Sequence, residues 1–272
     1  MTQSATLPTS AQPLTAQVPG LLASLRFALF MAGLDIASSF RRTGLGTLWV
    51  TLGLALAIGA LGLLFGTVLQ QLVPHYNIYV PYLAAGMIAW SLLASILHQA
   101  AGQTWLFMAQ LRHTMLPLPA TMLRLILRQV LILAQNILLA VTLQAILLQT
   151  VTLAPLSLLA GIILLTANAT WMAVLIGMLC ARFRDMPQLV GWAVHLGFFL
   201  TPVLWPVEFL ARFGWLAQIN PLFHLVELVR QPLLGQPVAL LTWLLSLLAL
   251  LVGGSLTFLL YQRLRWRLPY WT

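Results

Sequence analysis

One stretch of the chain decides the fold class: Leu153–Leu179 reads LAPLSLLAGIILLTANATWMAVLIGML, without a single charged side chain. A helix crosses the hydrocarbon core of a bilayer with about 20 apolar residues, and this run is longer than that. The whole chain agrees with it, because 61% of its 272 residues are hydrophobic and only 6% are charged. An ordinary soluble domain has about 25% charged residues. We therefore expect an all-α membrane protein with several spans.

Six segments meet this length requirement and are the predicted transmembrane helices. They are Thr47–Leu69, Ile78–Leu97, Arg124–Leu147, Leu153–Leu179, Gln188–Trp205 and Val238–Tyr261. Ahead of them, residues 1–20 are uncharged and rich in Ser, Thr, Gln and Pro, which predicts a disordered cytoplasmic tail. We expect residues 21–272 to form a single transmembrane domain.

Arginine placement orients the predicted bundle. The chain has thirteen arginines and no lysine, and its net charge is +9. With the N-terminus inside, every arginine except Arg212 and Arg230 falls on the inner face. The positive-inside rule thus predicts a multi-pass protein with both termini in the cytoplasm. Because the arginines cluster between apolar runs, we interpret them as orientation signals and expect no nucleic acid partner.

The segment Leu21–Phe40 is apolar enough to be a seventh span, but it contains Arg26 and Asp35. Each would cost about 2–3 kcal/mol at the membrane centre, although both lie near the segment's ends. An interfacial helix should be amphipathic, yet these two charges fall on opposite sides of a helical wheel. The pattern therefore leaves a seventh span and an interfacial helix both open.

The stretch Val207–Pro237 is predicted to form a re-entrant or interfacial helical hairpin on the outer side. Pro202 and Pro206 should kink or end the helix before it. Asn220 and Pro221 then have the residue types of a helix start, with Asn as the cap and Pro at the first position. The apolar run that follows is too short to cross the membrane.

The sequence lacks the residues of several kinds of site. Without lysine it contains no P-loop, and its single cysteine, Cys180, excludes a two-cysteine metal site. No acidic residue lies at the centre of a predicted span, which disfavours proton-coupled transport, although His195 keeps that mechanism open. Glu208 and Glu227 are the one recognisable acid pair. Glu227 is also spaced for a local ion pair with Arg230, which contributes little if it is exposed.

Aromatic side chains gather in the predicted outer half and along the fifth predicted span. They form either an interfacial belt or stacking platforms for sugar rings on an export pathway. His195 shares a helix face with Trp192 and Phe199, and it either lines that pathway or, as we favour, forms a hydrogen bond inside the bundle. Asn136 and Asn168 are expected to form interhelical hydrogen bonds. The candidate pathway residues are Tyr76, Tyr79, Tyr82, Trp90, Trp192, His195, Phe199 and Trp205.

Two predicted cytoplasmic segments have residues suited to docking a soluble partner. One is the long loop Gln99–Met122, and the other is the turn after the fourth predicted span. Alternatively, the loop is a solvated connector and the turn is an anchor of the positive-inside kind. The candidate docking residues are Trp105, Arg112, His113, Arg182, Arg184 and Asp185.

Seven blocks, in order over about residues 34–272, resemble the permease subunit of ABC-2 type polysaccharide exporters, which move lipid-linked O-antigen, capsule or teichoic-acid chains. The first six blocks are DIASSFRRTGLGTLW (Asp35–Trp49), YLAAGMIAW (Tyr82–Trp90), LPLP (Leu116–Pro119), ARFRDMP (Ala181–Pro187), FFLTPVLWP (Phe198–Pro206) and NPLFHLVELVRQPLLG (Asn220–Gly235). The seventh, RWRLPYW at Arg265–Trp271, is similar to the basic-aromatic tail of the O-antigen branch.

The resemblance implies a homodimer of six-helix permeases in a bacterial inner membrane, with two separate ATPase subunits that hold ATP and Mg²⁺. It implies no catalytic residue and no metal site in this chain. It also implies that Leu21–Phe40 is interfacial and that Gln99–Met122 holds the coupling helix, with the turn Arg182–Pro187 nearby. A lipid-linked glycan would enter near Arg41 and Arg42, which would attract its phosphate. The alternatives are export of a small hydrophobic drug and, less favoured, a membrane-embedded transferase acting on lipid-linked substrates.

Overall fold

The computed structural model describes residues 30, 32–34, 44–69, 79–102, 118–207, 214–264 and 266–267. The regular structure in this part of the chain is helical, as predicted. The helices are α2 (Leu48–Leu69), α3 (Tyr79–Gly102), α5 (Leu118–Leu147), α6 (Pro155–Arg182), α7 (Met186–Leu200), α8 (Gly214–Ile219), α9 (Pro221–Leu233) and α10 (Leu240–Leu264).

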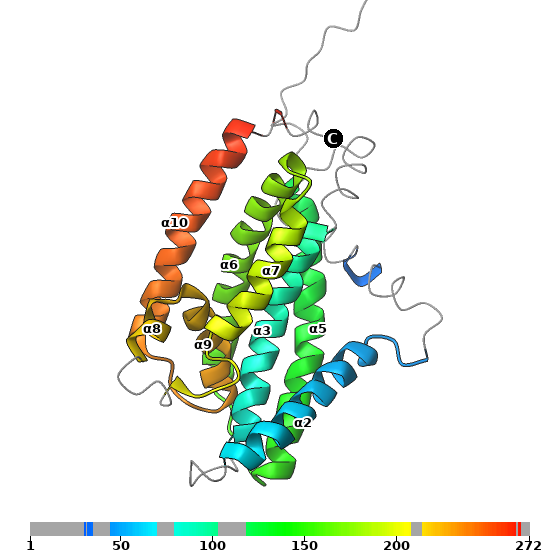
Figure 1. The fold of residues 1–272 in the computed structure, drawn as a ribbon, viewed down its shortest axis with the longest axis vertical. Coiled ribbons are helices and arrows are strands. Elements are labelled where there is room, and N and C mark those ends of the chain that lie inside the picture. Colours follow the sequence, from blue (N-terminus) through cyan, green and yellow to red (C-terminus); the bar gives the residue numbers. More distant parts are fainter. Residues whose placement is uncertain are drawn as a thin grey trace, which may run out of the picture.

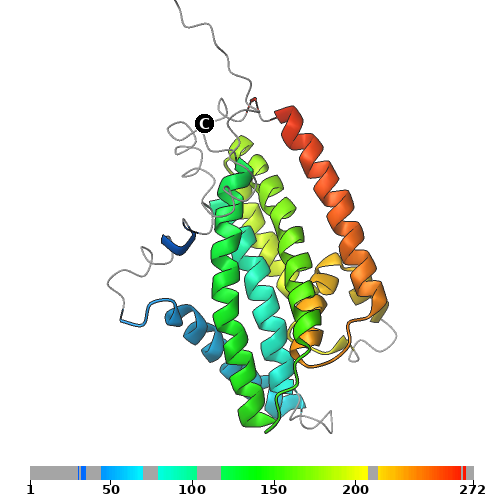
Figure 2. The same ribbon diagram turned by 180° about the vertical axis from the view of Figure 1, so that it is seen from behind.

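The long helices form a bundle in which α3 is the most buried (Figure 1). Helices α3, α5 and α6 run side by side, α10 packs on α6, and α2 slopes across the end of the bundle opposite the C-terminal end of α10 (Figures 1 and 2). Five helices are long and apolar enough to cross a membrane: α2, α3, α5, α6 and α10. They coincide with five of the six predicted spans.

The remaining predicted span, Gln188–Trp205, corresponds to α7, which ends earlier than expected. With 15 residues it is about 22 Å long, whereas the hydrocarbon core is about 30 Å thick. Thr201 follows α7 in an extended conformation, with φ −92° and ψ 132°. A residue before proline is driven out of the helical region, so Pro202 accounts for this end. Hydropathy alone misses the stop because Val203, Leu204 and Trp205 are still apolar.

Arginine side chains mark one end of the bundle. The C-terminal ends of α3, α6 and α10 lie at that end, together with the N-terminal ends of α5 and α7 (Figures 1 and 2). The described arginines on these ends are Arg124, Arg128, Arg182, Arg184, Arg263 and Arg267. The distribution matches the arrangement that the positive-inside rule predicts.

Polar contacts between helices occur where the sequence predicts them. The side-chain amide of Asn168 on α6 donates to the Ser246 carbonyl on α10 at 3.1 Å. Asn136 on α5 accepts a 2.7 Å hydrogen bond from the Thr51 hydroxyl on α2. Both interhelical hydrogen bonds are thus confirmed. Close helix contact also depends on Gly253 of α10, where a Cβ atom would lie 2.5 Å from the Trp171 ring.

Candidate functional site

Arg230, in the last turn of α9, is fully buried and joins three parts of the chain. Its Nη1 donates to Glu227 Oε1 at 2.6 Å and to the Tyr82 hydroxyl on α3 at 2.8 Å. Its Nη2 donates to the carbonyls of Pro202 at 2.8 Å and Val203 at 3.4 Å, both just beyond α7. One guanidinium group therefore links α9 to α3 and to the segment where α7 stops.

The residues of α3 are shaped to receive this guanidinium. The Arg230 Cζ lies 4.4 Å from the centroid of the Tyr82 ring, within the range of a cation–π contact. One turn further along α3, a Cβ atom at Gly86 would overlap with Arg230 Nη2, so a larger residue there would displace the guanidinium from this position. On α9, Gln231 donates to the second oxygen of Glu227 at 2.5 Å. We call Tyr82, Gly86, Glu227, Arg230 and Gln231 the α9 junction.

The ion pair that the spacing of Glu227 and Arg230 allows forms in the structure, and the alternative of an exposed pair is wrong. The Arg230 side chain is 0% exposed and that of Glu227 is 7% exposed. The reason is that α9 packs against α3, α6 and α10 instead of lying on the surface. A buried charge needs its partner far more than an exposed one does, so this pair is a strong structural constraint.

The N-terminal end of α9 is held by capping and by contacts to two other helices. Asn220 accepts the Leu222 backbone N–H at 2.9 Å, which confirms it as the N-cap, with Pro221 at the first helical position. Its side-chain amide also donates to the Thr201 hydroxyl at 3.0 Å, at the end of α7. His224, one turn into α9, lies 3.2 Å from the Thr242 hydroxyl on α10.

The C-terminal end of α9 is held by α5 and by the connection between α5 and α6. The Ala154 N–H donates to the Pro232 carbonyl at 3.0 Å, and the Gln144 side chain donates to the Leu233 carbonyl at 2.6 Å. Pro232 has no N–H, so the Leu228 carbonyl loses its helical partner. That carbonyl lies against Gly161 of α6, where a Cβ atom would overlap with it. Helix α9 is therefore fixed at both ends and along one side.

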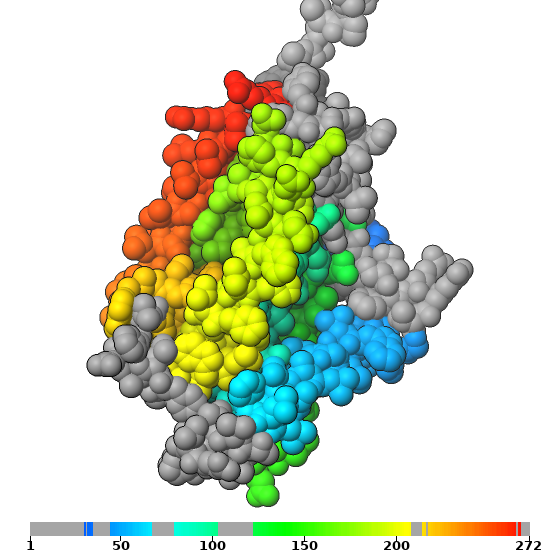
Figure 3. Space-filling view, viewed as in Figure 1, coloured from blue at the N-terminus to red at the C-terminus, as the bar shows by residue number. Residues whose placement is uncertain are grey.

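Helix α7 presents an aromatic face on the outside of the monomer, between α10 and α2 (Figure 3). Trp192 is 61% exposed and Phe199 is 64% exposed, and His195 between them is also exposed. The Nδ1 of His195 lies 2.7 Å from the Gly191 carbonyl, so it donates within its own helix. The ring is exposed in the monomer, which differs from the favoured hydrogen bond inside the bundle. The His98 ring of α3 is nearby, with a centroid distance of 5.6 Å.

Two cavities lie end to end along this face. The first, of about 530 Å³, is lined by Gln188, Trp192 and His195 among others. The second, of about 560 Å³, lies toward the α8–α9 end and includes Trp205 and Asn220. Phe199 lines both cavities. The structure thus brings the predicted residues Trp192, His195, Phe199 and Trp205 together on one surface.

Three other predicted pathway residues lie inside the monomer. The Tyr79 hydroxyl donates to the Leu204 carbonyl at 2.8 Å. Tyr82 belongs to the α9 junction, and Trp90 packs on Phe198 with a ring centroid distance of 5.8 Å. Tyr79 and Tyr82 thus hold the segment after α7, Trp90 packs on α7 itself, and none of these three rings lies on the aromatic face.

The turn between α6 and α7 is exposed at the arginine-rich end. Arg182, Arg184 and Asp185 are all exposed there. The turn is short because the Met186 N–H donates to the Phe183 carbonyl at 3.3 Å, and Asp185 directly precedes α7. The turn is therefore accessible to a partner on that side of the membrane.

Several predicted site residues fall outside the described part of the chain, as does most of Leu21–Phe40. Within the described part, no group of three or more His, Cys, Asp or Glu side chains is placed to hold a metal ion. The predicted residues outside it are Arg41, Arg42, Tyr76, Trp105, Arg112, His113 and Glu208.

No curated protein matches the sequence of this chain. The sequence model of the family described as ABC-2 type transporter matches residues 35–234, which is most of the chain and spans α2 to α9. The chain is accordingly a membrane component of an ABC transporter and belongs to the ABC-2 type transporter family.

Proposed function

We propose that this ABC exporter subunit moves a lipid-linked polysaccharide of the O-antigen kind to the outer side of a bacterial inner membrane. The family supports an exporter that works with a separate ATPase partner. The observation that supports the cargo is the aromatic face of α7, with Trp192, Phe199 and Trp205 along two successive cavities. Aromatic faces suit sugar rings because one side of such a ring is apolar and packs flat.

The same face supports a homodimer. Gln188, His195 and Asn220 line its cavities, and polar groups at membrane depth need protein or water beside them instead of lipid. A second copy packed across this face would enclose a wet, aromatic-lined channel between two α7 helices. In this arrangement α8 and α9 form the re-entrant hairpin at the outer mouth of the channel.

Energy would reach the channel from the arginine-rich end, which we assign to the cytoplasm together with both termini. The exposed turn with Arg182, Arg184 and Asp185 would contact the ATPase there, as would Trp105, Arg112 and His113 of the loop before α5. ATP binding would then push on this turn and shift α7, which directly follows it. Arg41 and Arg42 stay the proposed contacts for the phosphate of the cargo.

The test is to delete the gene and complement it with variants of the α7 face. In the deletion strain we expect lipid-linked polysaccharide to accumulate on the cytoplasmic side and to be lost from the cell surface. Trp192→Ala with Phe199→Ala should not restore the surface glycan, although the protein is made at its normal level. Phe258→Ala is the matched control, because Phe258 is an aromatic residue of α10 that is 59% exposed and lines neither of the two cavities.

The opposite results are equally informative. Normal surface glycan in the deletion strain, with no redundant exporter, would show that the cargo is wrong and would favour a small hydrophobic drug. Full export by the double alanine variant would leave the proposed cargo unchanged but would show that the α7 face is not part of the export pathway.

A further inference from the structure

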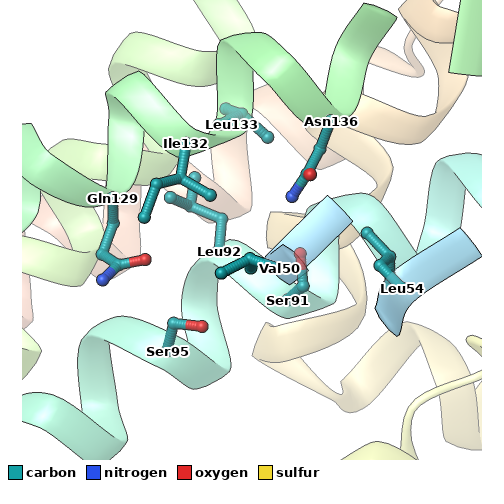
Figure 4. A pocket seen from close by; sticks show the side chains of 9 residues that line it. All are labelled: Val50, Leu54, Ser91, Leu92, Ser95, Gln129, Ile132, Leu133 and Asn136. Carbon is teal, nitrogen blue, oxygen red and sulfur yellow. The ribbon is translucent and has the colours of Figure 1, made fainter. Parts of the chain in front are cut away.

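A second site lies away from the α7 face, between α2, α3 and α5. It is a cavity of about 210 Å³ whose polar lining consists of Ser91, Ser95, Gln129 and Asn136 (Figure 4). Val50 and Leu54 of α2 line one side of it, and Leu92 and Leu133 are among its apolar walls. Ser95 is seven residues, or about 10 Å, before the end of α3, whereas Ser91 and Asn136 lie near the middle of α3 and α5, so the cavity lies near the middle of the bundle.

Some hydrogen-bond donors of this cavity have no partner in the described part of the protein. Gln129 is 5% exposed, and its Nε2 has no hydrogen-bond partner among the described residues. Asn136 is held by a chain of side chains in which Gln135 donates to Thr51 at 2.7 Å and Thr51 donates to Asn136 Oδ1 at 2.7 Å. The chain occupies the Asn136 oxygen and leaves its NH₂ group toward the cavity (Figure 4). A buried donor without a partner is costly, and such groups occur where a ligand supplies the acceptor.

The lining also defines the charge of the ligand. None of its residues is acidic or basic, and an unpaired ion at this depth would be strongly disfavoured. Phosphate and carboxylate groups are therefore disfavoured, whereas hydroxyl groups match amide donors and serine hydroxyls in kind. Ser91 already donates to the Ile88 carbonyl at 2.8 Å and is free only to accept. Cavities of about 150 Å³ hold a benzene ring, so 210 Å³ accommodates one six-membered ring with hydroxyl substituents.

A purely apolar cavity continues along the same three helices. It has a volume of about 330 Å³ and is lined by Ile58, Gly59 and Leu63 of α2, by Val80 of α3, and by Leu143 and Leu147 of α5. On α2 it begins at Ile58, four residues or about 6 Å beyond Leu54 of the polar cavity. The polar cavity is thus nearer the arginine-rich end, and the apolar cavity follows it toward the opposite end.

We infer that α2, α3 and α5 bind one uncharged, single-chain amphiphile, with its hydroxyl-rich head in the polar cavity and its alkyl chain in the apolar one. This orientation is that of a lipid from the leaflet next to the arginine-rich end. The site goes beyond the proposed export pathway, because it is uncharged and lies on other helices. Its occupant is a neutral glycolipid or acylglycerol, and a lipid-linked glycan with a phosphate does not fit it.

The test uses the full chain purified in an amine-oxide detergent, which has no hydroxyl groups to compete. Decyl β-glucoside is the probe, and native mass spectrometry counts the molecules bound per chain. We expect one glucoside bound and at least tenfold weaker binding of decanoate, which has a similar chain but a charged head. Free glucose should not displace the probe, because it lacks the chain. Gln129→Leu and Ser95→Ala should each weaken binding about fivefold, as for the loss of one neutral hydrogen bond.

Three further variants separate binding from folding. Gly59→Leu should weaken binding by filling the apolar cavity, since nothing in the described structure lies within 4 Å of a Cβ atom there. Thr142→Ala should leave binding unchanged, because the Thr142 hydroxyl is exposed and bonds within α5. Gln129→Leu should keep or raise the melting temperature, since it removes an unpartnered buried group.

Other outcomes would overturn the inference. A lowered melting temperature in Gln129→Leu would show that Gln129 stabilises the folded protein. Equal binding of glucoside to Gln129→Leu and to the original chain would place the probe elsewhere, as would equal binding of decanoate. Displacement of the probe by glucose at the same concentration would show that the alkyl chain contributes nothing to binding, and the ligand would then not be an amphiphile.

Discussion

Replacing Arg230 by methionine tests whether the α9 junction holds the bundle together. The substitution removes the hydrogen bonds to Glu227, Tyr82, Pro202 and Val203. It leaves the Glu227 carboxylate buried, with Gln231 as the remaining side-chain donor. Removing one partner of a buried ion pair typically costs about 3–5 kcal/mol, and we expect the free energy of unfolding to fall by that amount.

The companion variant Glu227→Leu should cost less, at the lower end of the same range. Arg230 would keep the Tyr82 hydroxyl, the face of the Tyr82 ring and two backbone carbonyls. The double variant removes both charges, so its cost should fall short of the sum of the single costs by at least about 1.5 kcal/mol. This shortfall is the coupling energy of the buried pair.

The assay is unfolding of the purified protein by titration with dodecyl sulfate, followed by circular dichroism. Arg184→Met is the control, because Arg184 is exposed in the turn after α6, and its cost should stay within about 0.5 kcal/mol. The reasoning fails if Arg230→Met is as stable as the control. It also fails if the two single costs add to the double cost within about 0.5 kcal/mol.

Two further predictions concern how α9 is seated. Gly161→Val should lower the free energy of unfolding by about 1–3 kcal/mol, because the new side chain would push on the Leu228 carbonyl. Gly53→Val on α2 is the control and should not lower it, since a Cβ atom there meets nothing within 4 Å. Equal melting temperatures for the two variants would contradict the contact between Gly161 and Leu228. Asn220→Ala should lower the free energy of unfolding by about 1 kcal/mol, because it removes the cap on the Leu222 N–H. Asn220→Asp should lose much less, since aspartate also caps a helix. Equal stability of the alanine and aspartate variants in the same titration would show that the cap is dispensable.

The helix boundaries that follow from local chemistry were predictable from the sequence. Pro202 stops α7 through its effect on the residue before it, and Asn220 with Pro221 starts α9. Apolar length likewise identified the five long helices. The fifth predicted span was placed too long, since its hydropathy continues through Trp205 while its backbone turns at Thr201.

The surroundings of each side chain could not be predicted in this way. Spacing shows that Glu227 and Arg230 can meet, but burial depends on Tyr82 and Gly86 of a distant helix. Gly86 was not among the predicted site residues, and its only signal is its place among small residues in YLAAG. Similarly, Asn136 was predicted to bond to another helix, whereas its partner Thr51 follows from the packing of α2 on α5.

The partner of Arg230 also has a consequence for how the protein is made. Tyr82 and Arg230 are 148 positions apart in the chain. A ribosome therefore releases α3 into the membrane long before residue 230 is synthesised. During that time the space beside Gly86 is without the Arg230 guanidinium that fills it in the folded protein. Helix α3, which has the largest buried share of the five long helices, reaches its final surroundings only after α9 has been inserted. Chaperone or lipid contacts with α3 during translation should accordingly persist until α9 emerges, and truncation before residue 230 should leave α3 accessible to them.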